Sequence, residues 1–467
     1  MNLRLRLSRV LNKETLQTAL QANWALLGVL VGFVLVAVST GQFTNYDSQL
    51  EFQAASGVVK WGLPYMTFGN LLNQPPVGFY IDAFFFRLFG SSYDVGVAVT
   101  TAFGVGCVFL VYEIGKLFYG KRTGLFAAAV FGLTPWQVVL SRLFLIDVQS
   151  LFFSLLTLLV GIVAVRRGSW KLLLVSGFFF GVAFSTKLFA IFMLIPLALY
   201  FLVHTPRKLK LYLVSPVFFV PAYLLSYLWY EIMTGRGLNF ILEHDDFSNY
   251  NPSGIAPSYF FVGNYLVVTL GALFLIAGAL SLLVSFSQRR LFAKFFSFDV
   301  ICALTIVAVA GVHTWMAVGQ NLGAPYVGAI KYDYQFLPLF CLLTASLAKK
   351  SRVLLEPTVF RTRKGKLSLV IALSGLVLLL GSMVMNMQVL STYANQKVIH
   401  FYVEGEVKYS FDNAAVPSNP FFSMAVQSLG FVFIELSLLW ANRDVLKYAE
   451  SFFSKVKPQV KKPPNSG

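Results

Sequence analysis

Long apolar runs recur from one end of this sequence to the other, and they limit what the chain can fold into. The composition is 57% hydrophobic and only 12% charged, whereas soluble domains carry about 25% charged residues. A run of about 20 apolar residues is long enough to cross the hydrocarbon core of a bilayer as a helix. We therefore predict an all-α polytopic membrane protein with about twelve transmembrane helices, near residues 24–41, 95–115, 123–140, 148–165, 171–186, 188–203, 212–232, 259–286, 299–318, 334–348, 367–387 and 422–441.

The basic residues predict how these helices are oriented. With the N-terminus inside, 29 of the 37 lysines and arginines fall in inner segments, as the positive-inside rule requires of a bacterial-type topology. Both termini are therefore expected in the cytoplasm, and 13 of the 20 acidic residues fall on the outer side. The net charge of +17 is explained by topology and by anionic lipid, and it does not imply nucleic acid.

The order of apolar and polar segments divides the chain into four parts. We expect a cytoplasmic amphipathic N-terminus (1–22) without a cleavable signal peptide, and a catalytic transmembrane domain (23–348) with outer loops 42–94 and 233–258. A C-terminal transmembrane region (349–441) with outer loop 388–421 and a basic cytoplasmic tail (442–467) follow. The three cysteines all lie in predicted spans, so no disulfide framework is indicated.

The first outer loop is unusually polar and carries two helix signals. Ser48 and Glu51 have the spacing of a capping box, which predicts a short helix that begins there. The Pro75–Pro76 pair can start a second helix. In that helix the apolar residues Val77, Ile81, Phe84, Phe85 and Leu88 share one face. Such a face is typical of a helix that lies on the outer leaflet of a membrane.

Several short motifs, taken in order, resemble those of a known family. They are Asp47 before a helix, Gln74–Gly78 (QPPVG), Leu117–Gly124 (LFYGKRTG), Ser141–Leu143 followed by Ile146–Asp147, Thr186–Lys187, Glu243–Asp245 (EHD) and Tyr334–Pro338 (YQFLP). Across roughly residues 25–345 this pattern is similar to the C-type glycosyltransferases that use a polyprenyl-phosphate-linked sugar. The nearest branch is that of the protein O-mannosyltransferases and lipid A aminoarabinose transferases.

The resemblance implies a set of site residues. Asp47 would be the general base, and Asp147 a second carboxylate that orients substrate or a structural partner of Arg142. Lys187, Arg142 and Lys331 would hold the donor phosphate, for which guanidinium and ammonium groups are suited. The remaining candidate contacts to substrate or loops are Gln74, His244, Glu51 and Tyr334.

Each of these residues also has an ordinary structural interpretation. Asp47 could simply favour a helix N-terminus, Lys187 could be a snorkelling lysine at a helix end, and Lys331 could pair with Asp333. The family's usual Asp-Glu pair is here Asp47–Ser48, and the basic residue before its double proline is here Gln74. A bound divalent metal therefore stays an open alternative, and no other cofactor is predicted.

The resulting hypothesis is an inverting glycosyltransferase with its active site on the outer face. It would move a sugar from a dolichyl- or undecaprenyl-phosphate donor to a protein, lipid or glycan acceptor outside a prokaryotic plasma membrane. The main alternative is a twelve-helix transporter or lipid flippase, which the span count fits, although no similarity between the two halves is evident. A noncatalytic scaffold of the same fold is the third alternative, because Ser48 replaces a family carboxylate.

Overall fold

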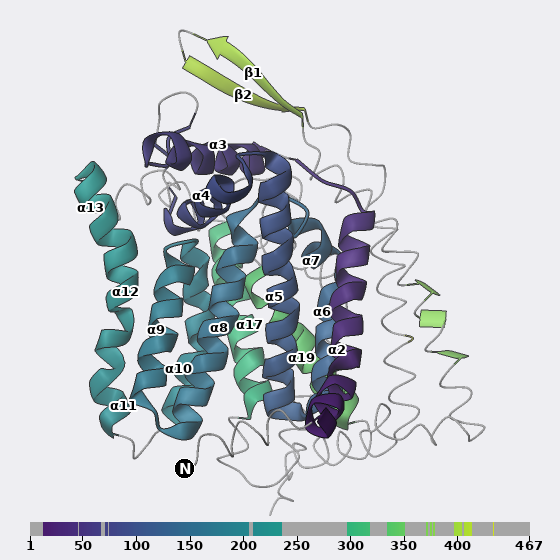
Figure 1. Cartoon of the computed structure of the whole chain (residues 1–467). Helices are drawn as coiled ribbons and strands as arrows, with labels where there is room; N and C mark the ends of the chain where they lie inside the picture. Colours follow the sequence, from purple (N-terminus) through teal and green to yellow (C-terminus); the bar gives the residue numbers. More distant parts are fainter. Residues whose placement is uncertain are drawn as a thin grey trace, which may run out of the picture.

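The computed structural model describes residues 13–44, 46–66, 71–72, 74–204, 209–235, 297–317, 334–350, 397–403 and 406–412, with isolated residues between 370 and 433. Its helices follow one another up and down in a bundle (Figure 1). The predicted spans within these residues correspond to α2 (Lys13–Ser39), α5 (Tyr93–Tyr119), α6 (Lys121–Leu133) with α7 (Pro135–Leu140), α8 (Ile146–Arg167), α9 (Trp170–Phe184), η1 (Leu188–Met193) with α10 (Leu194–His204), α17 (Phe298–Ala317), and η8 (Tyr334–Phe336) with α19 (Leu337–Lys350). The predicted span 259–286 and nearly all of 367–387 and 422–441 lie outside the described residues.

Prolines interrupt two of the predicted spans. Pro135 lacks a backbone N–H and separates α6 from the short α7. The run 212–232 is divided into α11 (Leu209–Val214), a 3₁₀ turn η2 (Ser215–Phe219), α12 (Val220–Ala222), a π-helical turn η3 (Tyr223–Leu228) and α13 (Trp229–Thr234). Pro216 and Pro221 lie at the start of η2 and of α12. The apolar run therefore located this helical segment, but it did not show where the segment changes between α-helical, 3₁₀ and π-helical turns.

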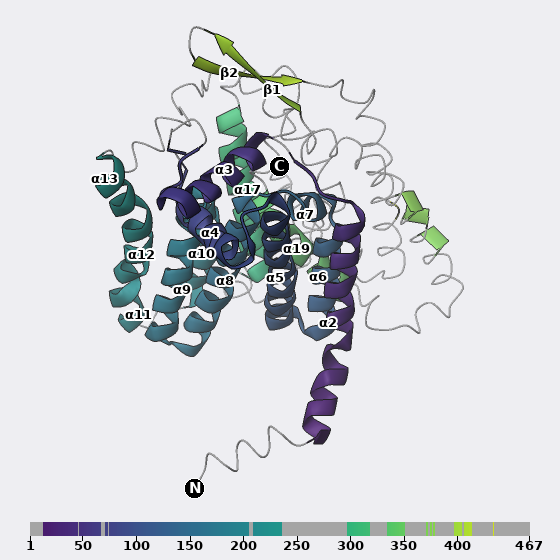
Figure 2. The same cartoon turned by 45° about the horizontal axis from the view of Figure 1, so that its top comes forward.

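Two further helices come from the first polar loop, α3 (Tyr46–Trp61) and α4 (Val77–Phe89). Both lie across the ends of α5 and α8, as the two views in Figures 1 and 2 agree. We call this the α3–α4 end of the bundle. The double proline does precede a helix, as predicted, and Phe84 and Leu88 on its apolar face are exposed.

The start of α3 differs from the prediction. The helix begins at Tyr46, so Ser48 lies within its first turn and does not cap it. Ser48 is instead fully buried, and its hydroxyl accepts a hydrogen bond from Tyr93 Oη at 2.8 Å. The capping-box spacing predicted that Ser48 caps the helix, but Ser48 instead makes a tertiary contact with Tyr93 of α5.

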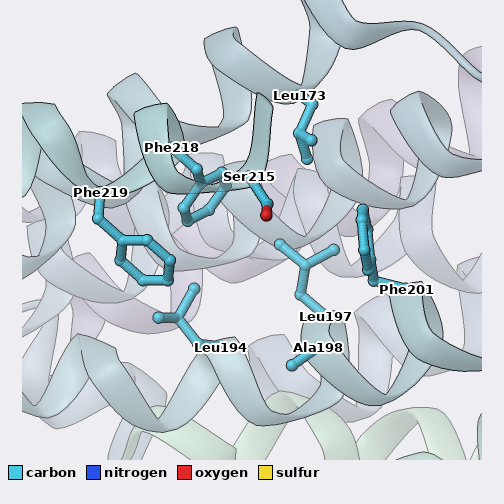
Figure 3. A pocket seen from close by; sticks show the side chains of 8 residues that line it. All are labelled: Leu173, Leu194, Leu197, Ala198, Phe201, Ser215, Phe218 and Phe219. Atoms are coloured by element: carbon cyan, nitrogen blue, oxygen red, sulfur yellow. The ribbon is translucent and has the colours of Figure 1, made fainter. Parts of the chain in front are cut away.

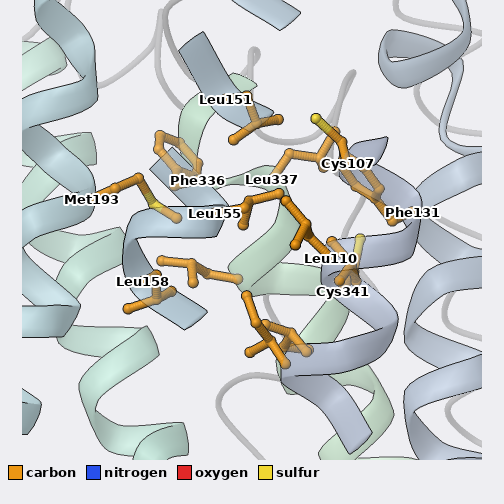
Figure 4. Close-up of a cluster of buried hydrophobic side chains, with 14 of the residues drawn as sticks. Cys107, Leu110, Phe131, Leu151, Leu155, Leu158, Met193, Phe336, Leu337 and Cys341 are labelled. Atoms are coloured by element: carbon orange, nitrogen blue, oxygen red, sulfur yellow. The ribbon is translucent and has the colours of Figure 1, made fainter. Parts of the chain in front are cut away.

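Two hydrophobic clusters hold the described helices together. The larger joins α5, α6, α8, η1 and α19, with Cys107, Leu155 and Cys341 among its members (Figure 4). The smaller lies under α3 and α4 and includes Phe79, Phe86 and Ile146. The three cysteines are buried and free, which agrees with the expectation of no disulfide.

The expectation of an all-α chain is wrong at one place. Strands β1 (Lys397–Val403) and β2 (Glu406–Asp412) pair as an antiparallel hairpin, in a register that places Lys397 opposite Asp412. The hairpin falls within the predicted outer loop 388–421. Residues 406–412 alternate between polar and β-branched or aromatic side chains, and residues 397–403 are rich in β-branched and aromatic side chains. Both patterns favour strands.

Helix length and hydropathy bear on the membrane prediction. Among the described helices, α5 and α8 are long and apolar enough to cross a bilayer. The outward-facing side chains of α2, among them Trp24, Leu35 and Val38, are large, apolar and more than half exposed. An extended exposed apolar surface of this kind marks an interaction site, here with lipid.

Candidate active site

The candidate site lies at the α3–α4 end, where α4 meets two turns of the bundle. Val77 N donates a hydrogen bond to the carbonyl of Ser185 at 2.9 Å. A Cβ atom on Gly78 would stand 2.8 Å from Ile146 Cγ2 and 2.9 Å from Thr186 Cγ2. Only glycine permits this approach, so the QPPVG motif docks α4 directly onto the start of α8 and onto the turn that carries Lys187.

Lys187 is buried between two carboxylates that come from distant parts of the sequence. Its Nζ atom lies 3.2 Å from Asp147 Oδ2 and 3.7 Å from Glu51 Oε1. The lysine is 6% exposed, and each acid is 1% exposed. Glu51 also accepts a hydrogen bond from Ile146 N at 3.0 Å, which fastens α3 to the first residue of α8. With one cation between two anions, this Glu51–Lys187–Asp147 cluster carries a net negative charge when all three groups are ionised.

A further carboxyl, Asp82, lies on the buried face of α4. It is 1% exposed, and Gln149 Nε2 donates to its Oδ1 atom at 2.6 Å. Neither Asp82 Oδ2 nor Gln149 Oε1 has a hydrogen-bond partner among the described residues. Burial raises the pKa of Asp82 well above its usual range, and the negative charge of Glu51 adds to this effect, while the Gln149 hydrogen bond opposes it. In the folded protein the protonated, neutral form of Asp82 is therefore favoured more than it is for an exposed aspartate.

The substitution Asp82→Asn is expected to make the protein more stable at pH 7. In the unfolded chain Asp82 ionises near pH 3.9, whereas in the folded chain it holds its proton to higher pH. The folded state binds more protons in this window, so stability falls as pH rises, by up to about 1.4 kcal/mol per pH unit. Asparagine does not ionise and keeps the contact with Gln149. Thermal unfolding in detergent at pH 5, 6 and 7 should show a gain that grows with pH.

Asp94→Asn is the matched control for this prediction, because Asp94 is an exposed acid in the first turn of α5. It should leave the pH dependence of unfolding as in the wild type. A constant offset between Asp82→Asn and wild type at all three pH values would show that Asp82 is ionised in the folded protein.

Asp47 and Glu51 are one helical turn apart on α3. Asp47 lies in the first turn of α3 and is half-buried. Because side chains at i and i+4 share a helix face, Asp47 lies on the same side of α3 as the acid that contacts Lys187. The structure thus brings together Glu51, Asp147 and Lys187, all of which the sequence had nominated, and places Asp47 one helical turn before Glu51 on α3.

Arg142 lies just before the start of α8 and has partners outside this cluster. The Nε atom of Arg142 donates to the carbonyl of Gly41 at 2.7 Å, and the Arg142 carbonyl accepts a hydrogen bond from Phe43 N at 3.1 Å. Burial lowers the pKa of Arg142, and the nearby charge of Asp94 opposes that shift. The pairing of Arg142 with Asp147, one of the two alternatives drawn from the sequence, is wrong, because Lys187 takes that acid.

The other nominated residues are scattered. Gln74 is half-buried, and its buried Oε1 atom has no hydrogen-bond partner among the described residues. Tyr334 is 2% exposed and donates to Gln137 Oε1, while Gln137 Nε2 donates to the carbonyl of Gly104 at 3.1 Å. Tyr334 thus joins η8 to α7 and α5 inside the bundle. Lys331 and His244 lie outside the described residues.

Sequence reasoning missed two residues of this region, Asp82 and Gln149. Asp82 was counted only as an outer acid. One signal could have found it: Phe79, Asp82, Ala83 and Phe86 repeat at helical spacing on the face opposite the lipid-facing residues. A buried acid needs a hydrogen-bond partner. Gln149, two residues after the nominated Asp147 on α8, is the partner of Asp82.

The described residues contain no candidate site for a metal ion. Within them, no three histidine, cysteine, aspartate or glutamate side chains come close enough together to hold a metal ion. His244, which the sequence had nominated with the family motif, is outside this part of the chain.

The comparisons with known proteins point to the same family of enzymes that the sequence motifs resemble. The family model described as dolichyl-phosphate-mannose-protein mannosyltransferase matches residues 73–229, about a third of the chain. Two Bacillus subtilis proteins, YkcB and YycA, are 31% and 34% identical over 147 and 141 residues. Their names carry an unproven assignment as mannosyltransferases. The matches cover 31% and 30% of this chain, but they span only 20% of the length of each relative.

Solved structures show that the likeness in fold covers nearly the whole chain. ArnT from Cupriavidus metallidurans bound to undecaprenyl phosphate has a TM-score of 0.54 and 15% identity, covering 94% of this chain and 81% of ArnT. The Archaeoglobus fulgidus oligosaccharyltransferase has a TM-score of 0.52 and 16% identity, covering 80% of this chain and 56% of that one. The helical membrane fold that the resemblance implied is therefore confirmed.

Proposed function

We propose that this chain is an inverting glycosyltransferase that takes its sugar from a polyprenyl-phosphate carrier. The proposal rests above all on the Glu51–Lys187–Asp147 cluster, a buried group of ionisable side chains at one end of a bundle whose fold is shared with ArnT. Burying such charges is costly, and buried ionisable clusters of this kind gather at functional sites. The family match over residues 73–229 includes Asp147 and Lys187.

The proposed reaction is a single displacement at the anomeric carbon. An acceptor hydroxyl oxygen attacks that carbon while its bond to the carrier phosphate oxygen breaks, and the electron pair of that bond leaves with the phosphate. Asp47 takes the proton of the acceptor hydroxyl as the general base. One displacement inverts the configuration at the anomeric carbon. Asp47, half-buried at the membrane-facing helix α3, can meet an acceptor from water and a donor from lipid.

The geometry favours different roles for the two nearby cations. Lys187 already lies between Asp147 and Glu51, so it fixes the positions of both carboxylates. Arg142 is less buried, and a guanidinium suits bidentate phosphate contact. We therefore assign Arg142, with Lys331, to the departing phosphate, and Lys187 first to positioning.

The proposal also includes the topology, the localisation and the partners of the chain. The chain would have about twelve helices in a prokaryotic plasma membrane, with cytoplasmic termini and the α3–α4 end outside. Its partners would be the polyprenyl-phosphate-linked sugar, the bilayer and an extracytoplasmic protein, lipid or glycan acceptor. The undecaprenyl phosphate bound to ArnT and the naming of the family after dolichyl-phosphate-mannose support this donor class. The transporter alternative has no such support.

The decisive experiment is consumption of donor by the full chain in nanodiscs. Undecaprenyl-phosphate and dolichyl-phosphate donors carrying radiolabelled mannose, glucose or aminoarabinose are each incubated with extracytoplasmic extract as acceptor. We expect labelled product and free polyprenyl phosphate from one donor class, at a rate that Arg142→Ala lowers at least tenfold. The control, Arg167→Ala, changes an exposed arginine at the other end of α8 and should keep the full rate. No turnover of any donor by the folded wild type would refute the proposal.

A further inference from the structure

A second feature of the bundle, far from the candidate active site, is an apolar groove between α9, α10 and η2. Its volume is about 190 Å³, and it is lined by Leu173, Leu194, Leu197, Ala198, Phe201, Ser215, Phe218 and Phe219 (Figure 3). Leu173, Leu197 and Phe218 form a buried floor, whereas Ala198 and Phe219 are exposed at the rim. The groove therefore opens sideways, and seven of its eight lining side chains are hydrocarbon. A lining of this kind favours a hydrocarbon chain over a polar group.

The packing of α9 explains why a groove forms at this level. Leu173, Gly177 and Gly181 follow one another at a spacing of four residues, on one face of α9. At the two glycines the neighbouring segment approaches closely. A Cβ atom on Gly177 would stand 2.6 Å from the carbonyl oxygen of Phe218, and one on Gly181 2.5 Å from Pro221 Cβ. At Leu173 a leucine side chain takes the place of glycine, and the groove lies at this level, beside the close contacts of Gly177 and Gly181.

The position of the groove along the bundle distinguishes the two leaflets. Leu173 is only three residues from the start of α9, which lies at the end opposite α3 and α4 (Figure 1). At 1.5 Å per residue, roughly 16 Å of helix separate Leu173 from Phe184 at the other end of α9. Half of a bilayer's hydrocarbon core is about 15 Å thick. The groove therefore belongs to the leaflet opposite the α3–α4 end.

Positive charge flanks the groove on that side. Lys171 lies in the first turn of α9 and Lys210 at the start of α11, and both are exposed. The two segments begin at the same end of the bundle and pack side by side (Figure 1). Arg167, exposed at the end of α8, adds a third cation. A lipid chain in the groove would bring its headgroup to this basic rim, where an anionic phosphate is favoured.

We propose that the groove holds one acyl chain of an anionic phospholipid from the leaflet opposite the α3–α4 end, with Lys171 and Lys210 beside its phosphate. The site is separate from the Glu51–Lys187–Asp147 cluster and does not depend on the transferase proposal. A bound lipid fills the seam below the glycines and thereby supports the contact of α9 with η2.

Native mass spectrometry of the full chain tests the site. The protein is reconstituted in nanodiscs of equimolar dioleoyl phosphatidylglycerol and dioleoyl phosphatidylcholine, and the lipid retained after ejection is identified. We expect wild type to retain one phosphatidylglycerol. Ala198→Phe and, from the opposite wall, Ser215→Phe should fill the groove and lower this retention at least fivefold. Val217→Phe, an exposed neighbour that does not line the groove, should retain lipid as wild type does.

The charge assignment has its own test. Lys171→Gln with Lys210→Gln should keep one lipid but lose the preference for phosphatidylglycerol over phosphatidylcholine. Wild-type retention by the folded Ala198→Phe and Ser215→Phe variants would overturn the site. Equal retention of both lipids by wild type would overturn the headgroup assignment. Displacement of phosphatidylglycerol by equimolar undecaprenyl phosphate would overturn the proposal by assigning the groove to a carrier tail.

Discussion

Replacing Lys187 with methionine is expected to destabilise the protein by about 3–5 kcal/mol, the usual cost of removing one partner from a buried ion pair. Methionine matches the length of the aliphatic stem but leaves Asp147 and Glu51, each 1% exposed, without the ammonium group between them. Two uncompensated carboxylates in a buried site must then take up protons or draw in water. Thermal unfolding of purified Lys187→Met in detergent should show a large loss, and donor consumption should be abolished.

Two comparisons separate this effect from a general loss of a lysine. Lys349→Met removes an exposed lysine near the end of α19 and should unfold as wild type does. Combining Lys187→Met with Glu51→Gln and Asp147→Asn removes the uncompensated charge and should restore most of the stability, although not the activity. If Lys187→Met alone unfolds at the wild-type temperature, the cluster contributes nothing to stability and the burial argument fails.

The helices could be predicted from the sequence because hydrophobic runs decide them locally. The run at 148–165 became α8 with only two more residues at each end. The breaks were harder, because the 3₁₀ and π turns of 215–228 depend on how η2 and α12 fit against the glycines of α9. The capping prediction for Ser48 was wrong for the same reason. Its hydroxyl accepts a hydrogen bond from Tyr93, 45 residues further along the chain, and does not cap the helix.

The candidate site divides in a similar way. Asp47, Asp147 and Lys187 could be nominated because each lies in a motif or breaks the positive-inside trend. The partner of Asp147 could not be predicted, since Arg142 and Lys187 are both basic. Only the packing of α8 against α9 brings Lys187 to Asp147. Asp82 could not be nominated from its charge alone. Its burial depends on how α4 packs in the bundle and on the hydrogen bond from Gln149.

Asp47→Asn is expected to lower the rate of sugar transfer by about 10²–10⁴-fold, the usual contribution of a general base. Asparagine keeps the size of the side chain but cannot accept the proton of the acceptor hydroxyl. Asp47 lies in the first turn of α3, where a carboxylate contributes only about 0.3–1 kcal/mol through the helix dipole. Stability should therefore change little, and donor affinity should stay near the wild-type value. Single-turnover assays in nanodiscs measure the rate, and donor titration measures the affinity.

Glu51→Gln decides whether Asp47 or its neighbour on α3 is the base. Glu51 is 1% exposed, and its two carboxylate oxygens face Lys187 and Ile146 N, so it has little access to an acceptor hydroxyl. We expect Glu51→Gln to weaken the cluster, with lower thermal stability and a smaller loss of transfer rate than Asp47→Asn. The acidic limb of the pH–rate profile, where the rate falls as a general base takes up a proton, should survive in Glu51→Gln and vanish in Asp47→Asn if Asp47 is the base. The reverse pattern would move the catalytic role one helical turn along α3, into the buried cluster itself.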